Sequence, residues 1–238
     1  MIAVWKREMQ SYFYTPVGYV FMGVFLTLSS VIFFLQIMSQ RSSDLLTFIG
    51  NMSYLWMLLC PVLTMRLLAE ERQKKTDQLL FTSPVSLPDI VLGKFFAAVS
   101  VLLLSAGLSL VYALVVAIYG RVFPAELAVC MLGFCLQGCA FVAMDLYFSA
   151  CARTPVIAAV LAFGANLLLW IGDLLGSQFS PAWLSRAISF FSLYRRNEPF
   201  LLGQLSYAGV LYDLSFSAAF LALTVHHLDA YRYRRAEL

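Results

Sequence analysis

The residues of this sequence that could carry chemistry are few, and the most unusual is an acid inside an apolar stretch. Asp145 stands near the end of a long run of apolar residues. If that run crosses a membrane, an ionisable side chain within it is a functional candidate by default, because its burial is costly. The alternatives are a part in substrate passage or gating, a structural pair with Arg66 or Arg153, and a place in a wet vestibule.

Histidine and cysteine pairs are the other candidates, and both favour a structural interpretation. His226 and His227, with Asp229 nearby, are neighbours in a helical pattern. Adjacent helical residues point about 100° apart, so they chelate one ion poorly. Cys135 and Cys139 are spaced to share one helix face. Thiolates select soft metals, but small residues that pack buried helices together are the alternative that we favour.

Sequence motifs of catalysis are missing. The phosphate-binding pattern G-x-x-x-x-G-K-[ST] does not occur, since Gly93-Lys94 lacks the upstream glycine and the following serine or threonine. Neither the nucleophile pattern G-x-S-x-G nor the zinc-protease pattern H-E-x-x-H is present. We therefore expect no ATP binding through a phosphate loop, and a membrane enzyme would have to use Asp145 and the histidine pair.

Composition assigns these residues to a membrane protein. The 238 residues are 61% hydrophobic and 12% charged, whereas soluble domains are roughly 45–50% apolar and about 25% charged. So little charge cannot cover a soluble surface, and a disordered chain needs low hydrophobicity. The formal net charge of +3 is too small and too dispersed for nucleic-acid binding. An integral membrane protein without a nucleic-acid partner remains.

The gaps between charged residues locate the membrane spans. Six long stretches have almost no Asp, Glu, Lys or Arg, and each suffices for a helix across a bilayer core of about 30 Å. The runs are continuous rather than alternating, which favours helices over a barrel. We therefore predict an all-α membrane domain, residues 16–238, with six transmembrane helices over about 16–38, 46–68, 92–119, 126–150, 154–175 and 208–229.

Residues 1–15 have a different pattern from the spans. Trp5, Met9, Tyr12 and Phe13 recur at helical spacing among charged residues. This pattern predicts an amphipathic helix that lies in the membrane interface before the first span. The alternative is a frayed basic N-terminus with scattered aromatic residues.

The connection between the fifth and sixth spans, residues 176–206, is too apolar for a free loop. We expect it to be packed or re-entrant on the outer side, with short helices over 181–191 and 199–205. Three acids near the outer membrane edge are expected to face headgroups or this outer region, and two arginines are available to pair with the last of them. The acids are Glu126, Asp173 and Asp213, and the arginines are Arg195 and Arg196.

Basic residues set the expected orientation. With six spans both termini lie on one side, and most of the 16 lysines and arginines lie on that side, many of them between the second and third spans. Positive charge favours the cytoplasmic side of a membrane. We therefore expect both termini and residues 66–94 in the cytoplasm. The first apolar run is expected to stay as an anchor, because no small-residue cleavage site follows it.

The most strongly patterned segment is residues 70–94. Glu70 with Lys74, and Glu71 with Lys75, are helical i,i+4 pairs in the favourable order. They predict that the first part of the segment forms a charged helix.

The second part of this segment is apolar at first and then breaks the helix. Leu79-Leu80-Phe81 precedes Thr82-Ser83-Pro84, which stops the helix. A charged helix with an exposed Leu-Leu-Phe tip suits docking into a groove of a soluble partner. The alternative, which the residues leave equally open, is a solvated loop that the same apolar tip holds against the spans.

Several of these segments together resemble permease subunits of type-2 ABC transporters, and the nearest group looks like the gliding-motility-type permeases. The resemblance covers nearly the whole chain. It rests on Trp5-Lys6-Arg7-Glu8 with Tyr12-Phe13, Pro16 and Gly18-Tyr19, on Glu-Glu-Arg…Thr-Asp-Gln-Leu-Leu-Phe-Thr-Ser-Pro-Val-Ser…Ile-Val-Leu-Gly-Lys within residues 70–94, and on the turn Ser149-Ala-Cys-Ala-Arg-Thr. Two positions depart from the family's pattern: Lys75, where relatives usually have glycine, and Asp145, where relatives are apolar or have glycine.

The resemblance implies an architecture and a contact site. It implies an N-terminal elbow helix, six spans, and a cytoplasmic coupling segment over residues 70–90 between the second and third spans. In that family the segment contacts a separate ATP-binding subunit. The role carries over to Glu70, Glu71, Arg72, Thr76, Asp77, Leu79, Leu80, Thr82, Ser83 and Pro84.

The function that the resemblance implies is that of a non-catalytic permease subunit of an ATP-driven exporter in the inner membrane of a bacterium. A second permease subunit, identical or related, is expected beside it in the lipid bilayer. The ATP-binding partner is expected to bind ATP and Mg, with no cofactor and no metal in this chain. Asp145 and Asn166 are the candidates for the translocation path or a gate. A membrane enzyme using Asp145 and a scaffold that recruits a cytoplasmic protein remain as alternatives.

Overall fold

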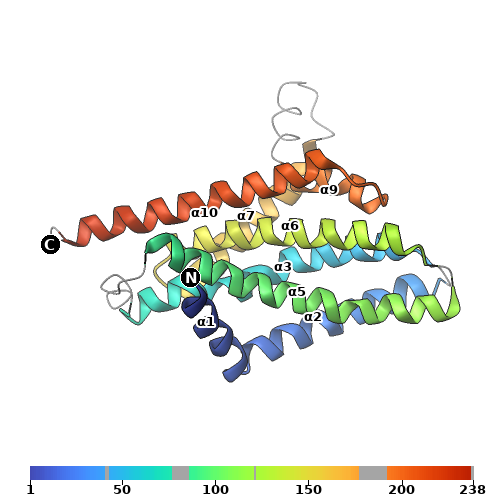
Figure 1. Ribbon diagram of the computed structural model, residues 1–238, viewed down its shortest axis with the longest axis horizontal. Helices are drawn as coiled ribbons and strands as arrows, with labels where there is room; N and C mark the ends of the chain where they lie inside the picture. The colour runs from blue at the N-terminus through green and yellow to red at the C-terminus, as the bar shows by residue number, and fades with distance from the viewer. Residues whose placement is uncertain (41–42, 77–85, 121, 177–191, 237–238) are drawn as a thin grey trace.

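The computed structural model describes residues 1–40, 43–76, 86–120, 122–176 and 192–236, and the regular structure in this part of the chain is entirely helical. Long helices run side by side, and the short α1 crosses their direction (Figure 1). In chain order the helices are α1 (Ile2–Tyr14), α2 (Val17–Phe33) with the π-helical turn η1 (Phe34–Met38), α3 (Leu45–Gln73), α5 (Leu87–Tyr119), α6 (Pro124–Cys151), α7 (Pro155–Gly176), α9 (Leu193–Leu201) and α10 (Tyr207–Ala236).

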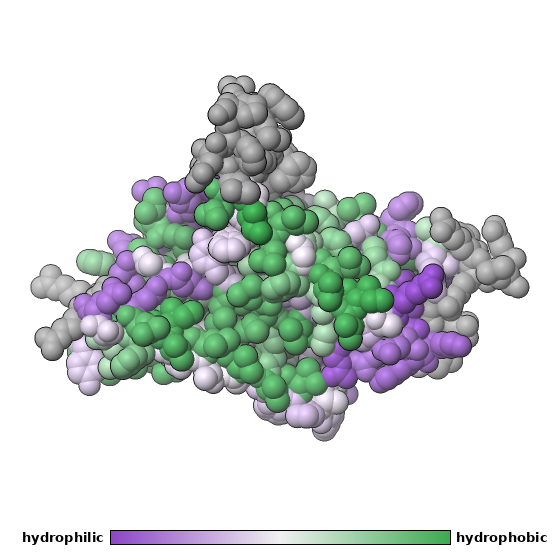
Figure 2. All heavy atoms as spheres, turned by 180° about the vertical axis from the view of Figure 1, so that it is seen from behind, coloured by the Kyte–Doolittle hydropathy of each residue, from purple (hydrophilic) through white to green (hydrophobic). Residues whose placement is uncertain are grey.

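Six helices in the described ranges are long and apolar enough to cross a membrane, namely α2 with η1, α3, α5, α6, α7 and α10. Figure 2 shows apolar residues over the middle of one face of the molecule and hydrophilic residues gathered toward its two ends. A broad apolar belt between polar ends is what a bilayer requires of a protein surface. The predicted all-α membrane protein with six spans is therefore confirmed for the described residues.

The helices α3 and α6 form the centre of the bundle. More than half of the residues in the most apolar part of each are buried, against about a fifth in α7 and α10. Trp56 of α3 packs edge-on against Phe25 of α2 and Phe134 of α6, with ring centroids 5.7 and 6.3 Å apart. Because lipid tails are as apolar as these side chains, close packing of this kind holds the spans together.

Capping residues and one glycine set the helix ends that matter for the site. Asp44 and Ser86 each accept a hydrogen bond from the N–H three residues further on, and so begin α3 and α5. Between α1 and α2, a Cβ on Gly18 would lie 2.8 Å from the carbonyl oxygen of Tyr12. Glycine therefore permits the sharp turn that lets α1 cross the bundle (Figure 1).

The connection before α10 differs from the expected one. Residues 181–191 lie outside the described residues. The predicted helix over 199–205 is wrong: the helix is α9, because Ser192 accepts a hydrogen bond from the N–H three residues on and starts the helix earlier. Phe200 within α9 is fully buried and packs against α6 at Gly133. The described part of this connection is therefore packed on the bundle.

Candidate functional site

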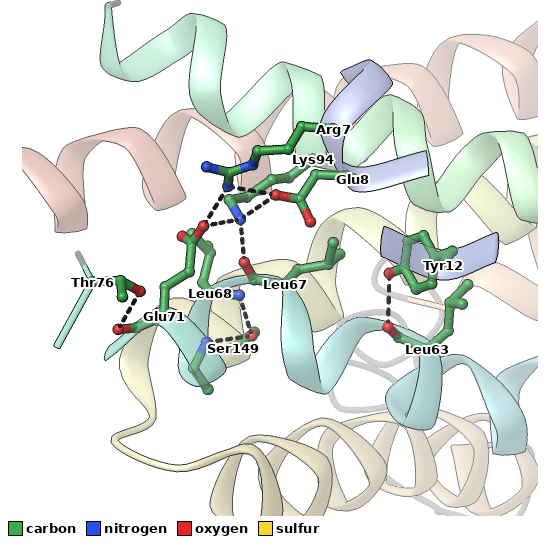
Figure 3. A network of polar contacts seen from close by, with 11 residues as sticks. Arg7, Glu8, Tyr12, Leu63, Leu67, Leu68, Glu71, Thr76, Lys94 and Ser149 are labelled. Atoms are coloured by element: carbon green, nitrogen blue, oxygen red, sulfur yellow. Dashed lines mark hydrogen bonds and ion pairs between the residues drawn. The ribbon is translucent and has the colours of Figure 1, made fainter. Parts of the chain in front are cut away.

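A buried lysine joins three helices at the end of the bundle where α3 ends and α5 begins (Figure 3). Lys94 of α5 is 1% exposed, and its Nζ lies 3.0 Å from a carboxylate oxygen of Glu8 on α1 and 3.0 Å from one of Glu71 on α3. Arg7 binds the same two carboxylates at 2.8 and 2.6 Å. We call these four residues, Arg7, Glu8, Glu71 and Lys94, the charged junction.

A glycine explains how α1 comes close enough to α5 to form the junction. A Cβ on Gly93 would lie 2.8 Å from the Cβ of Val4, so only glycine fits without a shift of α1. About two turns further along α5, the hydroxyl of Ser100 accepts a hydrogen bond from the indole N–H of Trp5 at 3.0 Å. The Leu-Gly-Lys end of the patterned segment therefore provides both the contact surface for α1 and the buried cation beside it.

Attraction between opposite charges outweighs burial in the junction. Burial acts to raise the pKa of the Glu8 carboxyl, but Lys94 and Arg7 hold this pKa below its ordinary value. Burial likewise acts to lower the pKa of the Arg7 guanidinium, but Glu8 and Glu71 raise it above its ordinary value. Each charge of the junction has a partner of opposite sign, which is the condition under which buried charges are tolerated.

A cavity of about 670 Å³ opens beside the junction, between α1, α3 and α5. Besides the junction residues, its walls include Arg66, Glu70, Lys74 and Thr76. The cavity therefore presents charges of both signs at the place where the patterned segment leaves α3.

The helix α3 ends in a turn that contains a left-handed residue. Lys75 has a φ of 57°, in the left-handed region. Its N–H bonds to the carbonyl of Arg72, and the N–H of Thr76 bonds to the carbonyl of Glu71. This is the Schellman ending of a helix, in which glycine is the usual left-handed residue. Lys75 therefore occupies the left-handed position of this turn.

This helix ending also decides between the two predicted ion pairs. The pair of Glu70 with Lys74 is confirmed, at 2.6 Å. The pair of Glu71 with Lys75 is wrong, because Lys75 lies beyond the last helical turn. Glu71 binds Lys94 and Arg7 instead.

Four of the predicted contact residues lie at the end of α3: Glu70, Glu71, Arg72 and Thr76. Arg72 donates to the carbonyl of Ala152 at 3.3 Å, and its guanidinium lies 4.4 Å from the ring centroid of Tyr231 on α10. These contacts connect the end of α3 to the ends of α6 and α10. The other predicted contact residues, Asp77, Leu79, Leu80, Thr82, Ser83 and Pro84, lie outside the described residues.

The sequence reasoning missed the part that Ser149 plays. Its hydroxyl accepts hydrogen bonds from the N–H groups of Leu68 and Ala69, at 3.3 and 3.2 Å (Figure 3). It also donates a hydrogen bond to the carbonyl of Met65 at 3.2 Å. Ser149 belongs to the turn motif of the resemblance, but its partners are at least 80 positions away in the chain. No local pattern could have indicated these contacts.

Asp145 and Asn166 lie together between α3, α6 and α7, with other partners than expected. Both are buried, and the Asn166 Nδ2 donates to Asp145 Oδ2 at 3.4 Å. The Asp145 carboxyl also interacts with the Cys60 thiol. The suggested pairs with Arg66 and Arg153 are wrong, because Arg66 binds a carboxylate of its own helix at 2.7 Å and Arg153 is exposed.

Asn166 also bonds to the backbone of α3. Pro61 has no N–H, so the carbonyl of Met57, four residues earlier, loses its partner in the helix. The Asn166 Nδ2 donates to this carbonyl at 3.1 Å. The amide therefore satisfies the carbonyl that Pro61 leaves without a helical partner and bonds to Asp145 with the same nitrogen.

Two acids toward the opposite end of the bundle, Asp173 and Asp213, have partly different surroundings from those expected. Asp173 accepts a hydrogen bond from Ser192 at 2.6 Å and lies 3.5 Å from Arg195. Asp213 is 1% exposed, and neither carboxylate oxygen has a hydrogen-bond partner among the described residues. The suggested pairing of Asp213 with Arg195 or Arg196 is therefore wrong, and Arg196 lies over a tyrosine ring of α10 instead.

The histidine and cysteine pairs have structural surroundings. Among the described residues, no group of three or more His, Cys, Asp or Glu side chains is placed to hold a metal ion. His227 packs edge-on to Tyr147, with ring centroids 6.3 Å apart. Cys135 and Cys139 lie half-buried on α6 and form no disulfide within the described residues.

Comparison with known proteins agrees with this architecture. Residues 25–189, more than two thirds of the chain, match the family described as ABC-2 family transporter protein. The matched part includes α3, Lys94 and Ser149. No curated protein matches the chain. With six helices suited to cross a membrane and this match over most of its length, the chain belongs to the ABC-2 family and is a membrane permease subunit of an ABC transporter.

Proposed function

We propose that this permease couples to a separate ATP-binding subunit through residues 70–90 and works as an exporter in the inner membrane of a bacterium. Within the ABC-2 family we assign it to the gliding-motility-type group that its motifs resemble. Membrane proteins of the family work with ATP-binding subunits. In our proposal that partner binds ATP and Mg, and a second permease subunit, identical or related, completes the translocation path.

The charged junction is the observation that carries this proposal. A segment that transmits motion has to be attached firmly to the helices that it moves. Lys94 binds Glu8 and Glu71 and also donates to the carbonyl of Leu67, so α1, α3 and α5 are joined where α3 ends. Buried ion pairs resist separation, because each charge left alone in a buried site is strongly unfavourable. A displacement of residues 70–76 is therefore passed on to α1 and α5.

The contacts of Arg72 extend this attachment to the other side of the bundle. Through the carbonyl of Ala152 and the ring of Tyr231, the end of α3 also contacts the ends of α6 and α10. Because the end of α3 contacts so many helices, a displacement of this end would reorient the spans and not only a single loop.

The proposed orientation has the charged junction in the cytoplasm, in agreement with the basic residues that surround it. It is tested with two cysteine variants at exposed positions, Lys74→Cys at the junction end and Leu202→Cys after α9. A membrane-impermeant thiol reagent should label the Leu202 variant in intact cells and the Lys74 variant only in permeabilised cells, with the unaltered chain as background. The reverse pattern contradicts the orientation.

The coupling itself is tested by association with a co-expressed ATP-binding subunit. Changing both Leu79→Asp and Leu80→Asp places charge in the apolar Leu79-Leu80-Phe81 stretch and should abolish co-purification of the two chains. The control is Leu202→Asp, which also replaces a leucine with aspartate, at an exposed position toward the other end of the bundle, and should leave association intact. If the double variant associates as the wild type does, the proposed coupling is contradicted.

A further inference from the structure

The backbone of α3 is held over residues 57–69 by side chains of four other helices. A regular α-helix satisfies its carbonyl and N–H groups internally, so a run of outside partners marks a stretch that depends on its neighbours. The contacts are Asn166 of α7 to the Met57 carbonyl, Tyr12 of α1 to the Leu63 carbonyl, Lys94 of α5 to the Leu67 carbonyl, and Ser149 of α6 to Met65, Leu68 and Ala69.

The contact of Ser149 differs from the other three because it involves both ends of one backbone hydrogen bond. In an unbroken α-helix the N–H of Ala69 bonds to the carbonyl of Met65. Here both groups bond to the hydroxyl of Ser149, at 3.2 Å each, and the N–H of Leu68 bonds to it as well. The helix α3 is continuous through these residues, but a hydroxyl that bonds to both groups competes with the hydrogen bond between them, and a side chain that inserts into the helical ladder is one cause of a helix bend.

Residues 65–69 lie between two fixed parts of α3. Before them, the carbonyl that Pro61 leaves without a helical partner is held by Asn166. After them, Glu71 enters the charged junction only two residues beyond Ala69. Ser149 is 1% exposed, so water does not compete for its partners. A change in the ladder at residues 65–69 therefore changes the direction in which the last turn of α3 points.

We propose that Ser149 is a positioning residue for coupling. Its hydroxyl holds the ladder of α3 open at residues 65–69. When the ladder closes, with the N–H of Ala69 returning to the carbonyl of Met65, the last turn of α3 swings to a second direction. Alternation between the two states during the ATP cycle carries the motion into the spans. This inference rests on the proposed function, because it takes the end of α3 as the place where an ATP-binding subunit acts.

The first test uses the permease alone and is independent of any ATP-binding subunit. Amide hydrogen exchange at Leu68 and Ala69 is compared between the wild type and Ser149→Ala. Without the hydroxyl the ladder should close, and exchange of the two amides should slow by roughly tenfold. Ser149→Thr keeps a hydroxyl and should behave as the wild type. Equal or faster exchange in Ser149→Ala would overturn the open ladder.

The control for this test is Ser53→Ala. Ser53 is a buried serine on α3 whose hydroxyl donates to the Ile49 carbonyl of its own helix. Its removal takes away a similar group without touching residues 65–69. It should leave the exchange of Leu68 and Ala69 unchanged, and a change like that of Ser149→Ala would show a general loosening and contradict the proposal.

The second test uses the complex with the ATP-binding subunit. In the wild type, exchange at Leu68 and Ala69 should differ severalfold between the nucleotide-free and the vanadate-trapped complex. Ser149→Ala should still assemble and bind nucleotide but lose this response, which a merely structural serine would not affect. A wild type without a response, or a variant that keeps it, overturns the inference. If the wild type fails to assemble at all, the proposed function fails, while the first test still decides whether the ladder is open.

Discussion

The charged junction and the pair of Asp145 with Asn166 both bury ionisable side chains, but they satisfy them differently. In the junction each carboxylate meets two cations at 2.6–3.0 Å. Asp145 meets an amide and a thiol, and its Oδ1 has no hydrogen-bond partner among the described residues. The first site is a closed network of opposite charges, and the second is a contact with neutral groups.

The difference indicates two kinds of mechanical role. A network of opposite charges resists separation and fails abruptly when one member is removed, because the remaining charges stay buried without partners. An acid held by neutral hydrogen bonds exchanges its partners at lower cost. The junction therefore suits a rigid attachment, whereas the Asp145 site, next to Pro61, suits a contact that adapts as α3 moves.

The largest expected effect follows removal of the buried cation. Lys94→Met leaves Glu8 and Glu71 to a single partner, Arg7, and should lower the free energy of unfolding by about 3–5 kcal/mol. Thermal unfolding in detergent measures the loss. Lys74→Met removes an exposed cation from its pair with Glu70 and should lower the value by less than about 1 kcal/mol. Equal losses for the two variants would remove the distinction between the junction and an ordinary surface pair.

The neutral site is tested by changing its two members separately. Asn166→Leu deprives the Met57 carbonyl of its donor and should lower the free energy of unfolding by about 1–3 kcal/mol. Asp145→Asn keeps an oxygen that accepts the hydrogen bond from Asn166, and should lower it by less than about 1 kcal/mol. Thermal unfolding in detergent measures the loss for both variants. A larger loss for Asp145→Asn would show that its charge is needed and would bring this site closer in kind to the junction.

The approach of α1 to the junction is tested by two alanine substitutions for glycine. Gly93→Ala forces a Cβ against Val4 and should lower the free energy of unfolding by about 1–3 kcal/mol. Gly107→Ala lies on the same helix, where a Cβ would meet no described atom within 4 Å. It should raise stability by up to about 1 kcal/mol through better helix propensity. Proteolysis within α1 provides a second measurement, and equal protection of α1 in both variants would contradict the close contact.

A substitution at the end of α3 is expected to raise the stability of the protein. Lys75→Gly relieves the left-handed conformation of a residue with a Cβ and should raise the free energy of unfolding by about 1 kcal/mol. Lys74→Gly, one position earlier, removes a residue in the right-handed helical region and should give no gain. Thermal unfolding of the two variants distinguishes the turn from a general effect of glycine.

The smallest expected effect is the dependence of the junction on pH. The pKa of Glu8 in the folded chain is below its ordinary value of 4.5, because Lys94 and Arg7 outweigh burial. Its contribution to stability is therefore fully present above pH 4.5 and is lost as the pH falls through the lower folded pKa. Glu8→Gln should remove this part of the acid response in unfolding curves recorded from about pH 7 to about pH 3. A response identical to the wild type would assign the acid sensitivity to other groups.

Features that depend on neighbours within one or two helical turns were predictable from the sequence. The six spans follow from gaps in charge, because an apolar environment along about 20 residues leaves no place for charged side chains. The pair of Glu70 with Lys74 follows from helical spacing. The prediction of a pair between Glu71 and Lys75 failed just beyond the end of α3, where a left-handed turn and two distant cations decide the outcome instead.

The sequence by itself thus determined that the chain is a bundle of six spans with one charged segment after the second. Only the tertiary structure decided which charges meet, because Lys94 and Glu8 are 86 positions apart and come together through the contact of α1 at Gly93. The same holds for Ser149 and Asn166. A serine or an asparagine in an apolar run resembles any small packing residue until the fold brings it to the backbone of another helix, since such contacts depend on position in space and not on spacing along the chain.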